Sequence, residues 1–582
     1  MKLILIAVIT IAVTLITLFL PGLALFTRYR WLKNTFERII FAPVVGIAYS
    51  SFLAILFYLG WMNRALVVLV VLVVWMTSVL MLYRSKNLIK INKNQLLVLV
   101  IVFLFFLSTV FFVAFPLAKS NKYVPDPNYD TSANYDRINV KIINLAHTNA
   151  NDNYLPYRQA QFFLNRTNLD EQSNLMPEWG VGFFMRTPLM GMVSAHILSI
   201  LTGEISFQYP WREVAEFPQY DYLMFQIIAQ FLNALVFLSG YLLLEKLFSR
   251  RVALISLCVM ALSGFFIYNT FYTWPKSFTA FLILGAFYLA YAKRQFFFAG
   301  TLMGMAYMAH DLALFFMPGI LLLAVNSRVL KHSAISVLKS IAPFILILLP
   351  WNIISRFIYG QESVFYYYPF AINGLPFSKD TVISEFFNTP ITQILYSKLQ
   401  SLAFLVLPFQ FIFEKASLLE KVATSTIFSL PGAAGLAIIP LSVWGIVTNL
   451  KKTRILFFGI IFIPLLCAIS LIGWPKGLGA LHFAQATVVL LIGYAASRLI
   501  KLRDIMKAAI LILLIAQLIM FSLYSYSVSI PHLSDLNLRV ITLLFGLISI
   551  YGCIAAILIS LLKFGKIQEN KYVLMLNRLW YN

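Results

Sequence analysis

Residues 3–26 read LILIAVITIAVTLITLFLPGLALF, a run without a single charged side chain. A helix needs about 20 mostly apolar residues to cross a hydrocarbon core about 30 Å thick, and this run is long enough. It is longer than the apolar region of a secretory signal and has no clear small-residue cleavage site. We therefore expect it to remain in the protein as the first transmembrane helix.

The composition of the whole chain is that of a membrane protein. Of its 582 residues, 61% are hydrophobic and 12% are charged, whereas a soluble domain has about 25% charged residues. The net charge of +23 does not indicate a nucleic-acid-binding protein, because Lys and Arg lie in short clusters between apolar runs instead of one stripe. No disulfide framework or thiolate metal site is expected, because each of the three cysteines lies inside an apolar run. They are Cys258, Cys467 and Cys553.

Further apolar runs follow the first, and together they predict an all-α polytopic membrane protein with about 13–15 transmembrane helices. Two runs on either side of His310 and Asp311 are short, which is why the number is a range. The runs lie at residues 3–26, 37–59, 65–83, 95–118, 222–245, 252–272, 277–292, 295–309, 311–326, 334–351, 427–449, 455–473, 480–498, 507–525 and 540–562.

Clusters of Lys and Arg fall on alternate connections between these runs. By the positive-inside rule they mark the cytoplasmic side, so we expect an external N-terminus and a cytoplasmic C-terminus in the inner membrane of a prokaryote. Acidic residues have the opposite distribution, with eleven between residues 119 and 221. The basic clusters lie at residues 28–38, 84–93, 246–251, 293–294, 328–331, 451–454, 498–507 and 563–571.

This map divides the chain into five parts. The first external loop, with about 100 residues, is too long for an unstructured connection and is expected to be partly helical and catalytic. Within it, the apolar stretch Pro188 to Leu201 is too short to span a bilayer, so it predicts an interfacial or re-entrant helix. The parts are four N-terminal transmembrane helices (1–118), the first external loop (119–221), core transmembrane helices (222–351), a second external loop (352–426) and C-terminal transmembrane helices (427–582).

The first external loop carries the most informative motifs. Residues 151–160 read NDNYLPYRQA, and Arg186-Thr187-Pro188-Leu189 later opens the short apolar helix. These features resemble the GT-C superfamily of integral membrane glycosyltransferases, such as aminoarabinose transferases and protein O-mannosyltransferase-like enzymes. Members have an acidic residue early in this loop, then an amphipathic helix and a Lys/Arg-Pro-Pro-Leu turn. The resemblance covers residues 152–325.

The resemblance implies a GT-C-like helical bundle that transfers a sugar, with inversion, from a polyprenyl-phosphate donor to a glycan, lipid or protein acceptor outside the membrane. It implies that Asp152 is the catalytic carboxylate, with Asn153 beside it, and that Tyr157 and Arg158 lie on the amphipathic helix. A divalent metal at Asp152 is an option, and no other cofactor is implied. The sequence departs from the superfamily pattern at Thr187, at His482 and in the four runs before the loop.

Glycosyl transfer from a lipid phosphate needs a carboxylate at the acceptor hydroxyl and cations at the leaving phosphate. Asp152 fits the first role, although Asp before a helix is also a common N-cap. Arg186 fits the second, because a guanidinium forks onto phosphate oxygens. Further candidates for the phosphate are Lys276 and Lys476, each in a Trp-Pro-Lys turn, and Arg356. Trp and Lys at the ends of spans are, in the alternative interpretation, membrane anchors.

His310 and Asp311 interrupt an apolar stretch, where ionisable side chains are costly unless they pair or face a polar cavity. We expect them, with His482, to support the site, although a His next to an Asp is only a weak metal signal. His196 in the short apolar helix is a weaker candidate.

Two other functions remain open at this point. A transporter or lipid-glycan flippase also needs many spans, but it predicts ionisable residues near the midplane, broken helices and short loops. A glycan polymerase or ligase of another membrane fold predicts a catalytic loop late in the chain. The long loop after the fourth run and the absence of a Gly-rich nucleotide-binding loop in the sequence favour the glycosyltransferase.

Overall fold

The computed structural model describes most of the chain up to residue 502. The described residues are 2–32, 34–85, 91–114, 155–166, 174–176, 181–182, 186–202, 219–271, 273–325, 330–358, 379–406, 438–471 and 484–502. Within them the protein is an all-α polytopic membrane protein with six helices long and apolar enough to cross a bilayer, or seven if one bent pair counts as a span. A short antiparallel pair of strands, β1 (Asn174–Met176) and β2 (Val181–Gly182), is the one non-helical element in that part.

The first four helices follow the predicted apolar runs. They are α1 (Lys2–Tyr29), α2 (Thr35–Tyr58), α3 (Arg64–Arg84) and α4 (Lys93–Ala114). Helices α1 and α2 pack backbone to backbone because Gly22 lies against Ala42 and Gly46 lies against Leu18. Small residues allow this close approach, which supplies much of the attraction between helices in a bilayer.

The first predicted external loop contains two described helices, α5 (Leu155–Asn165) and α6 (Leu189–Leu201). Helix α6 has the predicted length and is almost wholly buried, packed against α2 and α5, and its interfacial or re-entrant placement stays a prediction. Two hydrogen bonds join α5 and α6 to the turn between α2 and α3. Arg166, just after α5, donates from Nη2 to the Met62 carbonyl at 2.6 Å. Arg64 donates from Nε to the Ser199 carbonyl at 3.0 Å.

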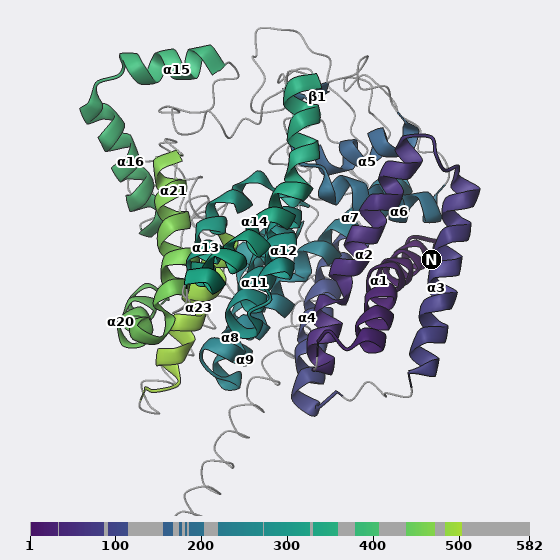
Figure 1. Ribbon diagram of the computed structural model, residues 1–582, viewed down its shortest axis with the longest axis horizontal. Helices are drawn as coiled ribbons and strands as arrows, with labels where there is room; N and C mark the ends of the chain where they lie inside the picture. The colour runs from purple at the N-terminus through teal and green to yellow at the C-terminus, as the bar shows by residue number, and fades with distance from the viewer. Residues whose placement is uncertain are drawn as a thin grey trace, which may run out of the picture.

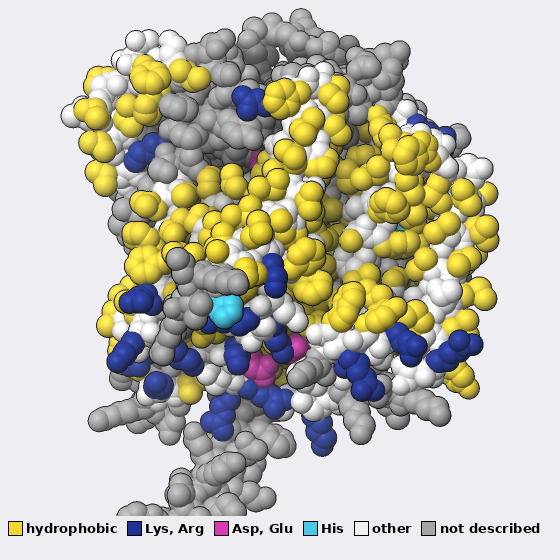
Figure 2. Space-filling model, viewed as in Figure 1, with side chains coloured by type: hydrophobic (Ala, Val, Ile, Leu, Met, Phe, Trp, Pro, Cys, Tyr) yellow, Lys and Arg dark blue, Asp and Glu magenta, His cyan; other side chains and the backbone are white. Residues whose placement is uncertain are grey.

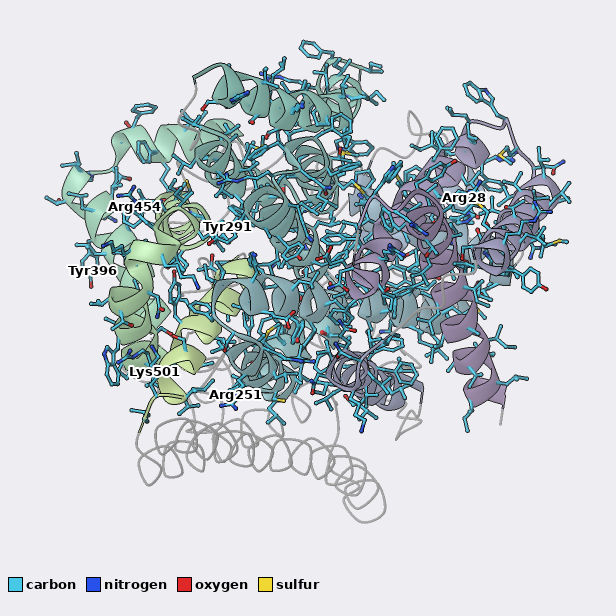
Figure 3. The ribbon with its side chains drawn as sticks, turned by 60° about the horizontal axis from the view of Figure 1, so that its bottom comes forward. Arg28, Arg251, Tyr291, Tyr396, Arg454 and Lys501 are labelled. Atoms are coloured by element: carbon cyan, nitrogen blue, oxygen red, sulfur yellow. The ribbon has the colours of Figure 1, made fainter. Side chains whose placement is uncertain are left out.

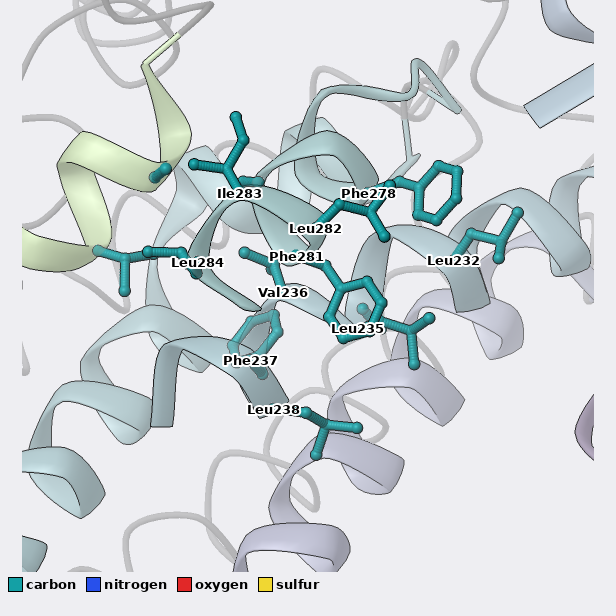
Figure 4. Packing of buried hydrophobic residues seen from close by; sticks show 14 of the residues in the cluster. Leu232, Leu235, Val236, Phe237, Leu238, Phe278, Phe281, Leu282, Ile283 and Leu284 are labelled. Carbon is teal, nitrogen blue, oxygen red and sulfur yellow. The ribbon is translucent and has the colours of Figure 1, made fainter. Parts of the chain in front are cut away.

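The core of the bundle is built from helices that follow this loop (Figure 1). They are α7 (Gln219–Ala234), α8 (Val236–Leu247), α9 (Arg250–Leu262), α10 (Gly264–Phe271), α11 (Lys276–Tyr288) and the π-helical turn η6 (Leu289–Lys293). Figure 4 shows Leu235 and Phe237 packed among the α11 side chains Phe278 and Phe281. The predicted span at 252–272 is broken at Ser263, where the two halves meet at 64°.

The remaining helices complete the described bundle. They are α12 (Phe296–Ala309), the 3-10 helix η7 (Asp311–Phe316), α13 (Met317–Val325), α14 (Leu330–Ile353), η8 (Ile354–Ile358), α15 (Lys379–Asn388), α16 (Ile391–Val406), α20 (Ile438–Leu456), η11 (Phe457–Phe462), α21 (Ile463–Leu471) and α23 (Gln485–Leu499). The predicted break between residues 449 and 455 is wrong, because the helical backbone continues from α20 through η11 into α21. Lys452 lies inside this continuous helix and donates from Nζ to the Leu247 carbonyl at 2.7 Å, at the end of α8. The predicted runs at 507–525 and 540–562 lie outside the described residues.

The basic clusters within the described residues gather at one end of the bundle. Figure 2 shows most Lys and Arg side chains of the visible face along its lower edge, below a broad hydrophobic surface. Figure 3 brings this end forward, with Arg28 near the end of α1, Arg251 near the start of α9, and Arg454 inside the α20–α21 helix. Contacts join the clusters, since Lys293 Nζ lies 2.7 Å from Glu37 Oε1. Arg250 Nη2 also donates to Asn92 Oδ1 at 3.0 Å. The basic clusters within the described residues therefore share one end of the bundle, whereas the assignment of that end to the cytoplasm stays a prediction.

Two glycines set the contact between α12 and α14. Gly300 lies against the Ser340 backbone and Pro343, and Gly304 lies against Ile347. We expect Gly300→Val to lower the free energy of unfolding by about 1–3 kcal/mol, because the added side chain has no space against a backbone. Thermal unfolding in detergent measures this, with Phe297→Leu on the exposed side of α12 as the control. Equal melting temperatures for Gly300→Val and the wild type would show that α12 and α14 do not pack this way.

Candidate functional site

One pocket brings together three of the predicted site residues, and a fourth lies next to it. The pocket lies between α5, the turn before α6, the corner before α11 and the break between α12 and η7. Arg186, His310 and Asp311 line it, and Lys276 lies beside it on the Trp274 ring. The lining residues are Leu155, Pro156, Gln159, Arg186, Thr187, Trp274, Pro275, Ala309, His310 and Asp311.

Three candidate site residues lie against the ring system of Trp274. Lys276 Nζ lies 3.6 Å from the centre of its ring system, and Arg186 Cζ lies 5.8 Å from it. The His310 ring stacks on the same indole, with a centroid distance of 6.2 Å and an angle of 26° between the planes. Because the face of an indole attracts cations, Trp274 can hold two positive side chains near one point despite their mutual repulsion.

The chain break at His310 places an ionisable pair in the same pocket. Helix α12 ends at Ala309, His310 is extended (φ −160°, ψ 123°), and η7 starts at Asp311. His310 Nδ1 lies 3.1 Å from Asp311 Oδ1, and both side chains are buried. Burial lowers the pKa of His310, and the positive charges of Lys276 and Arg186 lower it further, against the opposing effect of Asp311. Burial therefore favours the neutral imidazole, and the fixed cations at Trp274 are Arg186 and Lys276.

Helix α5 is fixed against the Arg186 turn by an uncharged residue that sequence reasoning passed over. Gln159 Nε2 donates to the Arg186 carbonyl at 3.2 Å. Gly191, early in α6, allows the approach, because a side chain there would collide with Gln159 and the Pro156 carbonyl. Gln159 stands four residues after Leu155, so both residues lie on the same face of α5. This spacing is the sequence feature that could have predicted that Gln159 lies near the pocket.

A second, small pocket adjoins the first and is mostly apolar. His310 lines both pockets, and Lys276 lines the second from the start of α11. The other lining residues are Thr279, Ala280, Ile283, Leu312, Ala313, Phe316 and Ala486, from α11, η7 and α23. His310 thus stands between the two pockets, and Lys276 belongs to the second while it contacts Trp274 of the first.

Other predicted site residues lie away from the first pocket. Tyr157 and Arg158 are buried in α5, and the Tyr157 ring packs on Tyr222 and Phe225 at centroid distances of 5.1 and 5.2 Å. Arg356 is exposed on η8 and lines neither pocket. His196 in α6 makes an edge contact with the Tyr49 ring at 5.5 Å.

The remaining candidates are not described. Asp152, Asn153, Lys476 and His482 lie outside the described residues. Asp152 precedes Leu155, which lines the pocket, by three residues. Among the side chains that the structure describes, no group of three His, Cys, Asp or Glu residues could hold a metal ion.

Comparisons with known proteins give one distant likeness. No protein-family model matches the sequence, and no curated protein matches it. Among solved structures, the chain is similar to the archaeal oligosaccharyltransferase AglB from Archaeoglobus fulgidus in complex with an inhibitory peptide and a dolichol-phosphate, with 14% identity and a TM-score of 0.40. The match covers 75% of this chain and 56% of the AglB chain. A likeness this distant carries no conclusion about activity.

Proposed function

We propose that the protein is a membrane glycosyltransferase that moves a sugar from a polyprenyl-phosphate-linked donor to a glycan, lipid or protein acceptor. The supporting observation is a pair of cations near one indole, Arg186 in the first pocket and Lys276 in the adjoining apolar pocket. A lipid phosphate has two parts that complement these features: an anionic group for the cations and a hydrocarbon chain for the apolar pocket.

Arg186 and Lys276 are the proposed phosphate ligands. The Lys276 side chain is 4% exposed, and charge–charge interactions are stronger in such a desolvated place than in water. When the sugar leaves the donor, negative charge grows on the phosphate, so fixed cations there stabilise the transition state. Trp274 keeps both cations in place before the donor arrives.

The apolar pocket beside Lys276 and His310 is the proposed place for the first isoprene units. Its lining from α11, η7 and α23 is mainly hydrocarbon, which suits a polyprenyl chain. The phosphate would then lie at the boundary of the two pockets.

Asp152 is the proposed catalytic carboxylate. Three residues of chain reach at most about 10 Å, so Asp152 can lie at the pocket that Leu155 lines. It would accept the proton of the acceptor hydroxyl, whose oxygen bonds to the anomeric carbon while the carbon–oxygen bond to the phosphate breaks and its electron pair leaves with the phosphate. Asp152 can also hold a divalent metal, and Asp311 would orient His310.

The pocket is proposed to open on the extracytoplasmic side of the membrane. Lys276 starts α11, and Lys293 ends η6, which follows α11 directly. Eighteen helical residues span about 27 Å, so the pocket lies well away from the basic end of the bundle. Since basic clusters mark the cytoplasmic side, the opposite end faces outside.

Binding of farnesyl phosphate, a short polyprenyl phosphate, tests the proposal. We expect Lys276→Gln to weaken its binding to the purified protein about 10- to 100-fold, because one charge-assisted contact to the phosphate is lost. Arg186→Ala is expected to act in the same direction. The measurement is titration calorimetry in nanodiscs, alongside transfer of a radiolabelled sugar from its polyprenyl phosphate.

The matched control is Lys246→Gln, on an exposed lysine at the basic end of α8. It removes the same charge far from the pocket and should leave binding unchanged. Equal affinities for the Lys246 and Lys276 variants, or no transfer from any polyprenyl-phosphate sugar by the wild type, would refute the proposed function.

A further inference from the structure

Three exposed aromatic rings meet where α1 ends. The Trp31 ring stacks on Tyr29, with a centroid distance of 5.7 Å and an angle of 24° between the planes, and it lies 5.9 Å from the Phe298 ring at the start of α12. Tyr29, Trp31 and Phe298 are 58%, 47% and 39% exposed. Exposed apolar side chains that form one patch are typical of an interaction surface, and Trp and Tyr are enriched where a membrane meets water. These three rings are called the aromatic cluster below.

The turn after α1 holds Trp31 in this place. Arg30 has a φ of 53°, in the left-handed region that few residues other than Gly adopt, so the chain turns sharply at the end of α1. Trp31 packs back on Phe26 of α1, at a centroid distance of 6.2 Å. Arg38 Nε donates to the Leu32 carbonyl at 2.7 Å and joins the turn to α2. The fold therefore fixes these rings before any partner binds.

The length of α1 places the aromatic cluster at the depth of lipid head groups. The candidate span Ile4–Tyr29 has 26 residues, which extend about 39 Å as a helix, whereas a hydrocarbon core is about 30 Å thick. The cluster belongs to the basic end of the bundle, because Phe298 follows Lys293 and Arg294 closely in the chain. Figure 2 shows the Lys and Arg side chains of this end along the lower edge of the hydrophobic surface. A lipid head group lies at the same kind of boundary.

Exposed arginines accompany the aromatic cluster. Arg28 and Arg30 flank Tyr29 in the sequence, and both are exposed. Within the described part of the chain, neither of their guanidinium groups makes a hydrogen bond or an ion pair. Arg294, just before α12, is also exposed and uses Nη1 for the Leu323 carbonyl at 3.3 Å, which leaves most of its five N–H donors for another partner. An anion is therefore attracted to a place that also offers apolar rings.

We propose that the aromatic cluster and its arginines bind an anionic phospholipid of the leaflet that adjoins the basic end. A guanidinium forks onto phosphate oxygens, which suits Arg28 and Arg30 to the head group. The rings of Tyr29 and Trp31 have an apolar body and a polar tip, so they suit the level where head group and acyl chains meet. A zwitterionic lipid carries a cation beside its phosphate and is attracted less by two arginines. This inference is independent of the proposed glycosyl transfer.

Lipid titration followed by native mass spectrometry tests this inference. The full-length protein in detergent is titrated with dioleoylphosphatidylglycerol, which is anionic, or with dioleoylphosphatidylcholine, which is zwitterionic and has the same chains. We expect the wild type to bind the first phosphatidylglycerol molecule about tenfold or more tighter than phosphatidylcholine. The double variant Arg28→Gln, Arg30→Gln is expected to reduce this preference about tenfold, as the loss of a charge-assisted contact does. Trp31→Leu should weaken phosphatidylglycerol binding about two- to fivefold, because the ring no longer supports the cations.

The matched control is the double variant Arg454→Gln, Lys501→Gln. It also removes two exposed cations, on the side of the bundle away from Arg28 (Figure 3). This control should keep the lipid preference of the wild type. Thermal unfolding in detergent shows whether each variant is folded, and Arg28→Gln alone, which leaves the turn at Arg30 unchanged, replaces the double variant if that one unfolds.

Three results would overturn the inference. One is equal binding of both lipids by the wild type, and another is the same loss of preference in the two double variants, which would mean unspecific attraction to a basic surface. The third is displacement of phosphatidylglycerol by an equal concentration of glycerol 3-phosphate, which would make the ligand a soluble anion instead of a lipid.

Discussion

Asp152→Asn is expected to lower the rate of sugar transfer about 10²- to 10⁴-fold, with donor binding changed little. This is the usual loss when a general base is removed, and an amide can neither accept the acceptor's proton nor hold a divalent metal well. The rate is measured by single-turnover transfer of a radiolabelled sugar from its polyprenyl phosphate. Farnesyl phosphate titration of the same preparation shows whether the variant is folded and its phosphate site intact.

Asp311→Asn is the matched control, because Asp311 is a carboxylate that demonstrably lines the pocket. It contacts His310 Nδ1 at 3.1 Å, so we assign it a positioning role and expect a loss of no more than about tenfold. If Asp311→Asn lowers the transfer rate about 10²- to 10⁴-fold and Asp152→Asn leaves it unchanged, the catalytic carboxylate is Asp311. A normal rate in both variants would remove the carboxylate from the mechanism.

Apolar run length predicted most helices, because a bilayer sets the length and polarity of a span. Residues 3–26 became α1, and residues 65–83 became α3, within three residues at each end. Run length does not report backbone direction, so neither the 64° bend at Ser263 nor the helix that continues past Lys452 was predicted. A basic residue marks the end of a span when its only alternative is to face lipid. Lys452 can lie inside a helix because its Nζ donates to the Leu247 carbonyl.

The candidate site was predictable where charged side chains stand at turns or interrupt an apolar stretch. Arg186 and Lys276 were chosen from their turns and the His310–Asp311 pair from its apolar surroundings, and the fold brings Arg186, Lys276 and His310 to the Trp274 ring. Uncharged residues gave no such signal, so Gln159 was missed. Arg356 was chosen for its charge alone, and its exposed position shows that charge near a span end does not locate a pocket. Tertiary packing decides which helix faces meet. The local pattern of one sequence does not show this packing.

Lys293→Met is expected to lower the free energy of unfolding by about 3 kcal/mol, because it leaves a buried carboxylate without its cation. Glu37 is 5% exposed, and its Oε1 lies 2.7 Å from Lys293 Nζ. The same oxygen accepts from the Tyr288 hydroxyl at 2.7 Å. This contact ties the start of α2 to the π-helical turn after α11, the helix that begins with Lys276. Chemical unfolding in detergent measures the loss, with Lys246→Met on an exposed lysine as the charge control.

The double variant Glu37→Gln, Lys293→Met separates the two terms of this contact. Removing one charge strands the other in a desolvated place, whereas removing both eliminates the stranded charge, so the double variant should regain most of the lost stability. A double variant as unstable as Lys293→Met would mean that the lysine's packing, and not its charge, holds η6. Because α11 and η6 form one continuous helical segment from Lys276 to Lys293, a stable α2–η6 contact also fixes the position of Lys276 beside the pocket. We therefore expect Lys293→Met, and not the double variant, to weaken farnesyl phosphate binding as well.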